Sequence, residues 1–126
     1  MSVVLDASAV LAFLHNEPGG DLTRAALDGG VVSSVNWAEI VQKALQRGVD
    51  TRGMQTDFSD IGVTFAAFDT THAEIAAEIW QRTRTKGLSF ADRACLALGV
   101  QRSLPVLTAD KAWRQLELGV DVRLVR

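Results

Sequence analysis

The sequence of 126 residues has little of several features that would point to particular classes of protein. Its single cysteine, Cys95, cannot form a disulfide within the chain, and its apolar neighbours favour a small buried side chain. The net charge is −2, so the chain has no global basic field with which to bind nucleic acid. No apolar run approaches the roughly 18 residues of a membrane span, and no secretory leader precedes the first strand-like run. We therefore expect a cytoplasmic protein that does not enter the membrane.

Internal repeats, low-complexity segments and linkers rich in proline, glycine or serine are also missing, and the chain contains only two prolines. The length then predicts one domain that spans residues 1–126. A domain of this size buries roughly two-thirds of the surface that its unfolded chain exposes. That burial is enough to build a core without disulfides.

Short β-like runs alternate with helix-like runs, which predicts parallel strands joined by right-handed crossovers. Apolar runs predict strands at residues 2–5, 31–35, 63–68, 105–108 and 122–125. Helical spacing and end signals predict helices at residues 9–16, 21–27, 36–46, 51–61, 71–85, 89–102 and 110–116. A capping box is expected at residues 71–74, and Ser89 is expected to cap a later helix. Together these elements predict a three-layer α/β/α sandwich around a five-stranded, mainly parallel sheet.

Four acidic residues fall where predicted strands end and predicted helices begin. Asp6 follows the first strand, and Glu39 lies in the first turn of the helix after the second strand. Asp110 follows the fourth strand, and Asp92 lies in the first turn of the helix that leads into it. Sites in open parallel sheets form at this edge, so we expect the four carboxylates to converge. Hard oxygen ligands suit Mg²⁺ or Mn²⁺, and such ions can activate water for attack on a phosphodiester.

Each of these acids also has a structural interpretation. Asp6 can form an Asx turn or cap the first helix, and Asp92 and Asp110 can cap helices. Glu39 lies opposite the apolar stripe of its helix, which predicts that it faces solvent. Spacing alone leaves the structural and the functional interpretation open.

Other polar residues could support such a site. Ser8 and Thr108 carry hydroxyl groups that can orient a ligand or a water molecule. Basic side chains in the segment 82–93 could form a local basic strip beside the acids. A solvated helix end is the simpler interpretation of that segment.

The segments that carry these residues resemble the motifs of PIN-domain nucleases. They are VLDASA at residues 4–9, SVNWAE at 34–39, LSFADRACLA at 88–97 and LTADKAW at 107–113. Their order and spacing resemble the VapC-type toxins of bacterial toxin–antitoxin pairs over nearly the whole chain. Carried over position by position, the resemblance assigns the metal-site acids to Asp6, Glu39, Asp92 and Asp110, and the supporting hydroxyls to Ser8 and Thr108.

The same resemblance implies a fold and a biochemical role. The fold is a sheet with strand order 3-2-1-4-5. The activity is that of an endoribonuclease that cleaves RNA with Mg²⁺ or Mn²⁺ as cofactor. The implied partners are a second copy of the chain, forming a homodimer, and a cognate VapB-type antitoxin that blocks the site.

Two other functions remain open at this point. A phosphoacceptor signalling domain shares the α/β alternation and would use Asp6 and Asp69, with a hydroxyl and a lysine late in the chain at Thr108 and Lys111. That class usually needs adjacent acids after the first strand, whereas Asp6 stands between two apolar residues, and it leaves two of the acids unexplained. A catalytically inactive PIN-like binding module is the other alternative. Metal-dependent cleavage of RNA separates the nuclease from both.

Overall fold

Five parallel strands form the central sheet of the computed structural model, which describes residues 2–126. The strands are β1 (Val3–Leu5), β2 (Gly30–Ser33), β3 (Thr64–Ala66), β4 (Val106–Thr108) and β5 (Val122–Leu124). Their order is β3-β2-β1-β4-β5, and every neighbouring pair is parallel. All three residues of the central strand β1 are buried, as expected for a strand that is covered on both faces. The predicted strand order is therefore confirmed.

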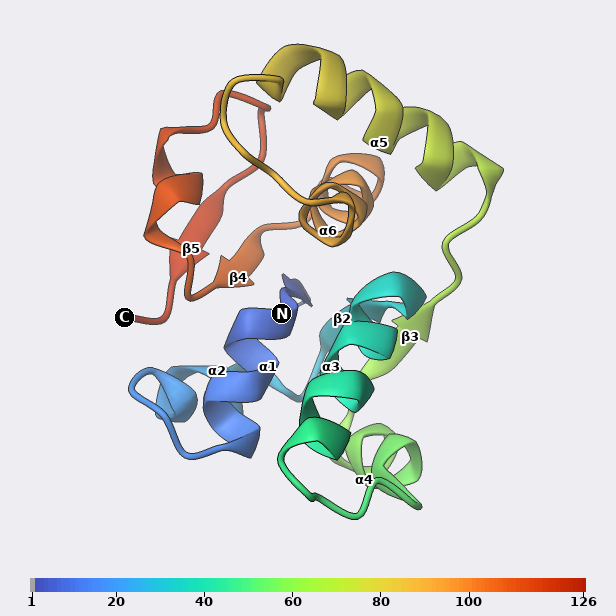
Figure 1. Cartoon of the computed structure of the whole chain (residues 1–126), viewed down its shortest axis with the longest axis vertical. Coiled ribbons are helices and arrows are strands. Elements are labelled where there is room, and N and C mark those ends of the chain that lie inside the picture. The colour runs from blue at the N-terminus through green and yellow to red at the C-terminus, as the bar shows by residue number, and fades with distance from the viewer. Residues whose placement is uncertain (1) are drawn as a thin grey trace.

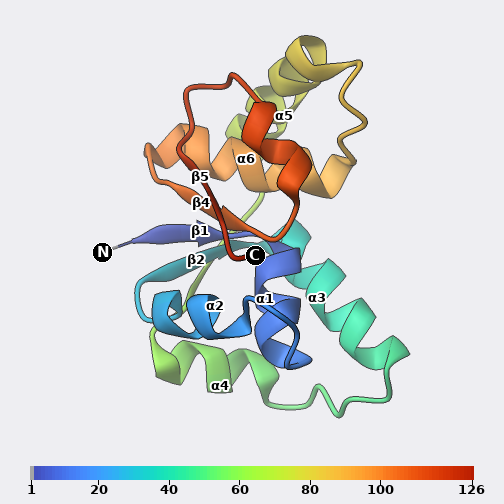
Figure 2. The same ribbon diagram turned by 90° about the vertical axis from the view of Figure 1, so that its left-hand side faces the viewer.

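Helices cover both faces of this sheet (Figures 1 and 2). On one side lie α1 (Ala7–Leu14), α2 (Gly20–Ala26), α3 (Ser34–Gln46) and α4 (Met54–Ile61), and on the other lie α5 (Thr70–Thr83) and α6 (Phe90–Arg102). Val3 and Leu5 point into the core beneath the first group, whereas Val4 points into the core beneath the second. This alternation follows from the two-residue period of a strand. The predicted three-layer sandwich is therefore confirmed.

The ends of several elements differ from the sequence-based expectation. The predicted capping box at residues 71–74 is wrong, because α5 begins at Thr70 and Asp69 caps it by accepting a hydrogen bond from the N–H of His72 at 3.0 Å. Aspartate is a strong N-cap because its short side chain reaches the free N–H groups of the first turn. The last predicted helix is a 3-10 helix, η1 (Lys111–Gln115). Across residues 2–126, no helix is long and apolar enough to cross a membrane.

The carboxyl ends of the central strands meet the N-terminal ends of three helices at one edge of the sheet. Figure 2 shows the starts of α1, α3 and α6 at this edge. Local capping fixes two of these starts. Ser33 accepts a hydrogen bond from the N–H of Val35 at the start of α3. Ser89 and Asp92 form a complete capping box at the start of α6, as the sequence predicts for Ser89.

Candidate active site

Asp6 is the buried carboxylate at the centre of this edge. It directly follows β1, and only 4% of its surface is exposed. Its Oδ2 accepts hydrogen bonds from the hydroxyls of Ser8, at 2.6 Å, and Thr108, at 2.8 Å. Its Oδ1 accepts no hydrogen bond from residues 2–126. Because Oδ1 is also not one of the fully buried atoms that lack a partner, this oxygen is in part exposed to solvent. The side chain makes no cap bond to α1, which removes the structural interpretation of Asp6 as a cap.

The electrostatic environment of Asp6 is unfavourable to its charge. Burial raises the pKa of the carboxyl from its usual 3.8 to about 6. The Ser8 and Thr108 hydroxyls lower this pKa, and the charges of Asp92 and Glu39 raise it further. The carboxylates of Glu39 and Asp92 therefore lie within electrostatic reach of Asp6. A buried acid with a perturbed pKa beside two like charges is a typical feature of a functional site.

The two hydroxyl groups hold more than the Asp6 carboxylate. The oxygen of Ser8 accepts the N–H of Ala109 at 2.9 Å, and the oxygen of Thr108 accepts the N–H of Asp110 at 3.0 Å. The two hydroxyl oxygens are 3.2 Å apart, and Thr108 is fully buried. This network joins the end of β1 to the end of β4, so the hydroxyls position both Asp6 and the backbone that carries Asp110.

The other three acids each use one oxygen to bind a neighbouring group of the chain. Glu39 Oε2 lies 3.4 Å from the ammonium of Lys43. Asp92 Oδ2 accepts the N–H of Ser89 at 2.9 Å, and Asp110 Oδ1 accepts the N–H two residues further along at 3.0 Å. The second oxygen of each acid accepts no hydrogen bond from residues 2–126. Capping a helix and binding a cation are therefore compatible here, because each role uses a different oxygen.

The four acids are not equally close together. Asp6, Glu39 and Asp92 interact electrostatically, whereas Asp110 is exposed and does not appear among the charges that shift the pKa of Asp6. In the described part of the chain, no three Asp, Glu, His or Cys side chains are close enough to form a ready metal-ligand set. Convergence of all four acids on one pocket therefore stays a prediction. The chemistry of the donors, four carboxylates with free oxygens, fits a hard divalent cation.

Asn36 is a residue of this site that sequence reasoning missed. It lies in the first turn of α3 and is fully buried. Its Nδ2 donates a hydrogen bond to the carbonyl of Ala91 at 3.0 Å, while its Oδ1 is buried without a partner among residues 2–126. The bond ties the start of α3, which carries Glu39, to the start of α6, which carries Asp92. The only signal in the sequence was a short polar residue inside a helix, where such residues are disfavoured unless they make a specific contact.

Three of the four basic residues of the suggested strip, Arg82, Arg84 and Lys86, lie at the end of α5, whereas the half-buried Arg93 follows Asp92 in the first turn of α6. Arg82 donates a hydrogen bond to the carbonyl of Glu117, and Arg84 lies over the ring of Trp80. Arg82 and Lys86 line a cavity with residues 115–118 that includes none of the four acids. The simpler interpretation, a solvated helix end, therefore describes these side chains better.

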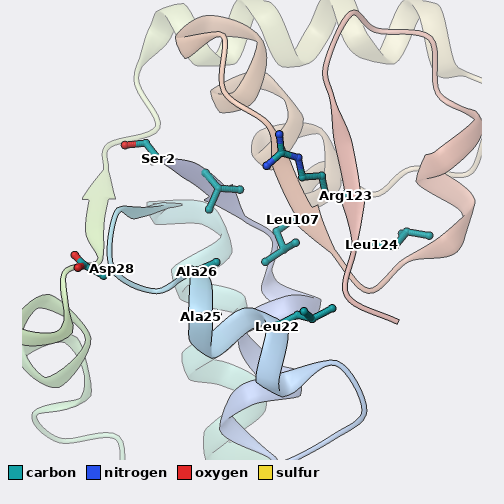
Figure 3. A pocket seen from close by; sticks show the side chains of 9 residues that line it. Ser2, Leu22, Ala25, Ala26, Asp28, Leu107, Arg123 and Leu124 are labelled. Carbon is teal, nitrogen blue, oxygen red and sulfur yellow. The ribbon is translucent and has the colours of Figure 1, made fainter.

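A second cavity, of about 410 Å³, also lies apart from the acids (Figure 3). It is formed by the start of β1, by α2, by β4 and by β5, and Leu22, Ala26 and Leu107 give it apolar walls. Asp28 and Arg123 are the charged residues of its lining. None of the four acids is in this lining.

The fold and the acids at its carboxyl edge define an α/β protein with a candidate acidic metal site. The sequence profile of the PIN domain family matches residues 3–118. The chain therefore belongs to the PIN domain family. No curated protein sequence matches the chain significantly.

Solved structures with the same fold include complexes of toxins with antitoxins. A toxin–antitoxin complex from Klebsiella pneumoniae contains a chain with 16% identity and a TM-score of 0.79, over 99% of this chain and 98% of that chain. DNA-bound VapBC from Salmonella typhimurium contains a chain with 16% identity and a TM-score of 0.72, over 100% of this chain and 99% of that chain. FitAcB from Neisseria gonorrhoeae has 21% identity and a TM-score of 0.70, over 95% of each chain. At these identities the likeness shows the fold.

Proposed function

We propose that this PIN domain protein is a metal-dependent endoribonuclease and acts as the VapC-type toxin of a toxin–antitoxin pair. The observation that carries the proposal is the buried carboxylate of Asp6, whose free oxygen lies at the edge that Glu39 and Asp92 share. Membership of a family of nucleases supports the hydrolase activity. The similar solved structures named as toxin–antitoxin or VapBC complexes support the role as a toxin.

In this proposal the acids Asp6, Glu39, Asp92 and Asp110 hold Mg²⁺ or Mn²⁺. When bound, such an ion supplies an activated water and neutralises charge that develops at the phosphodiester. Ser8 and Thr108 hold the Asp6 carboxylate by donating to its Oδ2, which leaves Oδ1 free. Asn36 keeps α3 against α6, so that the carboxylates carried by the two helices stay near Asp6.

The test is cleavage of single-stranded RNA by the purified protein in Mn²⁺ and in EDTA. We expect cleavage in Mn²⁺ alone, with products that carry a 5′-phosphate and a 3′-hydroxyl, because water is the attacking group. Asp92→Asn should abolish cleavage, and Asp57→Asn, at an exposed acid on α4, is the matched control. Products with a 2′,3′-cyclic phosphate, or cleavage that survives EDTA, would contradict the mechanism. An inactive binding module predicts no cleavage under either condition.

The proposed partners are a second copy of the chain and a cognate VapB-type antitoxin. An acidic pocket that cuts RNA must be restrained in its own cell, and a guanidinium can pair with carboxylates through two parallel hydrogen bonds. We expect the antitoxin to place an arginine among the four acids. Co-expression with the neighbouring gene, followed by purification and light scattering, tests both assemblies. A partner that contacts only the opposite face of the domain would contradict the blocking role.

The phosphoacceptor alternative finds no support in the arrangement of the strands. It requires the acid after β3 to lie beside the acid after β1. In this sheet β3 is an edge strand and β2 separates it from β1. The acid in question, Asp69, uses its carboxylate to cap α5.

A further inference from the structure

A groove of about 340 Å³ lies between α1 and α3, and we call it the α1–α3 groove. The two helices lie side by side and both begin at the acidic edge of the sheet (Figures 1 and 2). The residues that line the groove are Ser8, Leu11, His15, Glu17, Lys43, Gln46, Arg47 and Arg126.

The α1–α3 groove adjoins the candidate active site through Ser8, which lines the groove and contacts Asp6. At one end, Ser8 donates its hydroxyl to Asp6 at 2.6 Å. On the opposite wall, Lys43 lies 3.4 Å from Glu39, one helical turn away. Glu39, Lys43 and Arg47 follow one another at intervals of four residues, which corresponds to roughly 6 Å per step along a helix. This wall therefore changes from acidic to basic as it leads away from the edge.

The charge of the α1–α3 groove is opposite to that of the edge it adjoins. Lys43, Arg47 and Arg126 have cationic side chains, and Glu17 is the one acidic side chain in the lining. Glu17 lies 3.6 Å from both arginines. The side chains of Lys43, Arg47 and Arg126 are 51%, 56% and 39% exposed. Ion pairs with this much exposure are weak, so a ligand with several negative charges can compete for these cations.

We propose that the α1–α3 groove binds the phosphate backbone of single-stranded RNA on one side of the bond that is cut, with Lys43, Arg47 and Arg126 contacting phosphates. The inference rests on the proposed function, because it names how the same site holds its substrate. A polyanion that approaches four carboxylates is repelled, and a cationic groove beside them offsets this repulsion and sets the register of the strand. Contacts to phosphates position a strand without reading its bases.

The experiment compares two variants that lose the same charge. The groove variant is Lys43→Gln/Arg47→Gln/Arg126→Gln. The control variant is Arg82→Gln/Arg84→Gln/Lys86→Gln, which removes three exposed cations from the other side of the sheet. The probe is a fluorescein-labelled RNA decamer, and its binding is followed by anisotropy in EDTA at several salt concentrations. The folded state of each variant is checked by circular dichroism and thermal melting.

We expect the groove variant to bind RNA about tenfold more weakly or worse at 0.1 M salt, with a clear change in salt dependence. Each lost phosphate contact reduces the slope of log K against log salt by about 0.7 for a single strand, so three contacts predict a reduction of about 2. The control variant should keep the slope of the unmodified protein. If the groove variant does not fold, the single substitution Arg47→Gln should still reduce the slope by about 0.7.

Four results would overturn the inference. Equal losses in the two variants would show that net charge alone matters. An unchanged slope in the groove variant, while the unmodified protein cleaves RNA, would reject the groove and leave the proposed function standing. Weaker binding of a labelled decamer of glutamate to the groove variant, without any change for RNA, would assign the groove to an acidic protein segment. If the unmodified protein neither binds nor cleaves RNA, the proposed function fails together with the groove.

Discussion

Replacing Asp6 by asparagine should stabilise the metal-free protein at neutral pH, although it removes the central carboxylate of the site. In the folded protein the Asp6 carboxyl has a pKa of about 6, against an ordinary value of 3.8. Between these values the folded state binds more protons than the unfolded state. The free energy of unfolding therefore falls as the pH rises from about 4 to 6, and the loss is complete above that range.

The size of the effect follows from the difference between the two pKa values. A difference of about two units corresponds to about 3 kcal/mol at neutral pH. Asparagine resembles the protonated carboxyl in shape and charge, and its side-chain oxygen can accept the hydrogen bonds of Ser8 and Thr108. The side chain of Asp6 makes no capping hydrogen bond to α1, so the substitution does not weaken the start of that helix. About 3 kcal/mol is thus an upper value for the gain.

Urea unfolding in EDTA at pH 5, 6, 7 and 8 measures this gain directly. The advantage of Asp6→Asn should grow by about 1 kcal/mol between pH 5 and 7 and stay level above that. Asp57→Asn should show no such growth. A pH-independent difference, or a variant less stable than the unmodified protein at pH 8, would refute the reasoning. Saturating Mn²⁺ should reverse the order, since the ion stabilises the intact site alone.

Three further outcomes are expected. Mn²⁺ should raise the melting temperature of the unmodified protein, and Asp92→Asn should shrink this shift, as thermal melts with EDTA and with Mn²⁺ will show. Thr108→Val should lower the free energy of unfolding by about 1–3 kcal/mol in urea titrations, because it leaves the N–H of Asp110 without its hydrogen-bond partner and removes one of the two hydroxyls that donate to the buried Asp6 carboxylate, whereas Thr108→Ser should keep most of this stability. Ser89→Ala should lower the free energy of unfolding by about 1 kcal/mol, because the N-cap of α6 is lost. An RNA cleavage assay should also show lower activity, because the capping box that holds Asp92 is then incomplete.

Local patterns along the chain were enough to predict most of the elements and the positions of the acids. The cap at Ser89 and the strand that precedes Asp6 depend on residues within a few positions of each other, and such short-range preferences are visible in one sequence. The wrong capping box at the start of α5 also came from a short-range pattern. Thr71 and Asp69 both carry side chains that can cap, and only the path of the chain out of β3 decided between them.

Contacts between segments remote in sequence decided the rest. Burial in the folded protein, and not residue type, raises the pKa of Asp6. Asn36 bonds to α6 only because α3 packs there, and Arg126 reaches the groove that holds Arg47 only because β5 lies at the edge of the sheet. The sequence by itself determined which acids stand at the ends of strands and at the starts of helices. Tertiary packing determined which carboxylate oxygens accept hydrogen bonds, which are free and which cations lie beside them. These properties depend on distances between helices and strands that are remote in sequence, and no local pattern encodes those distances.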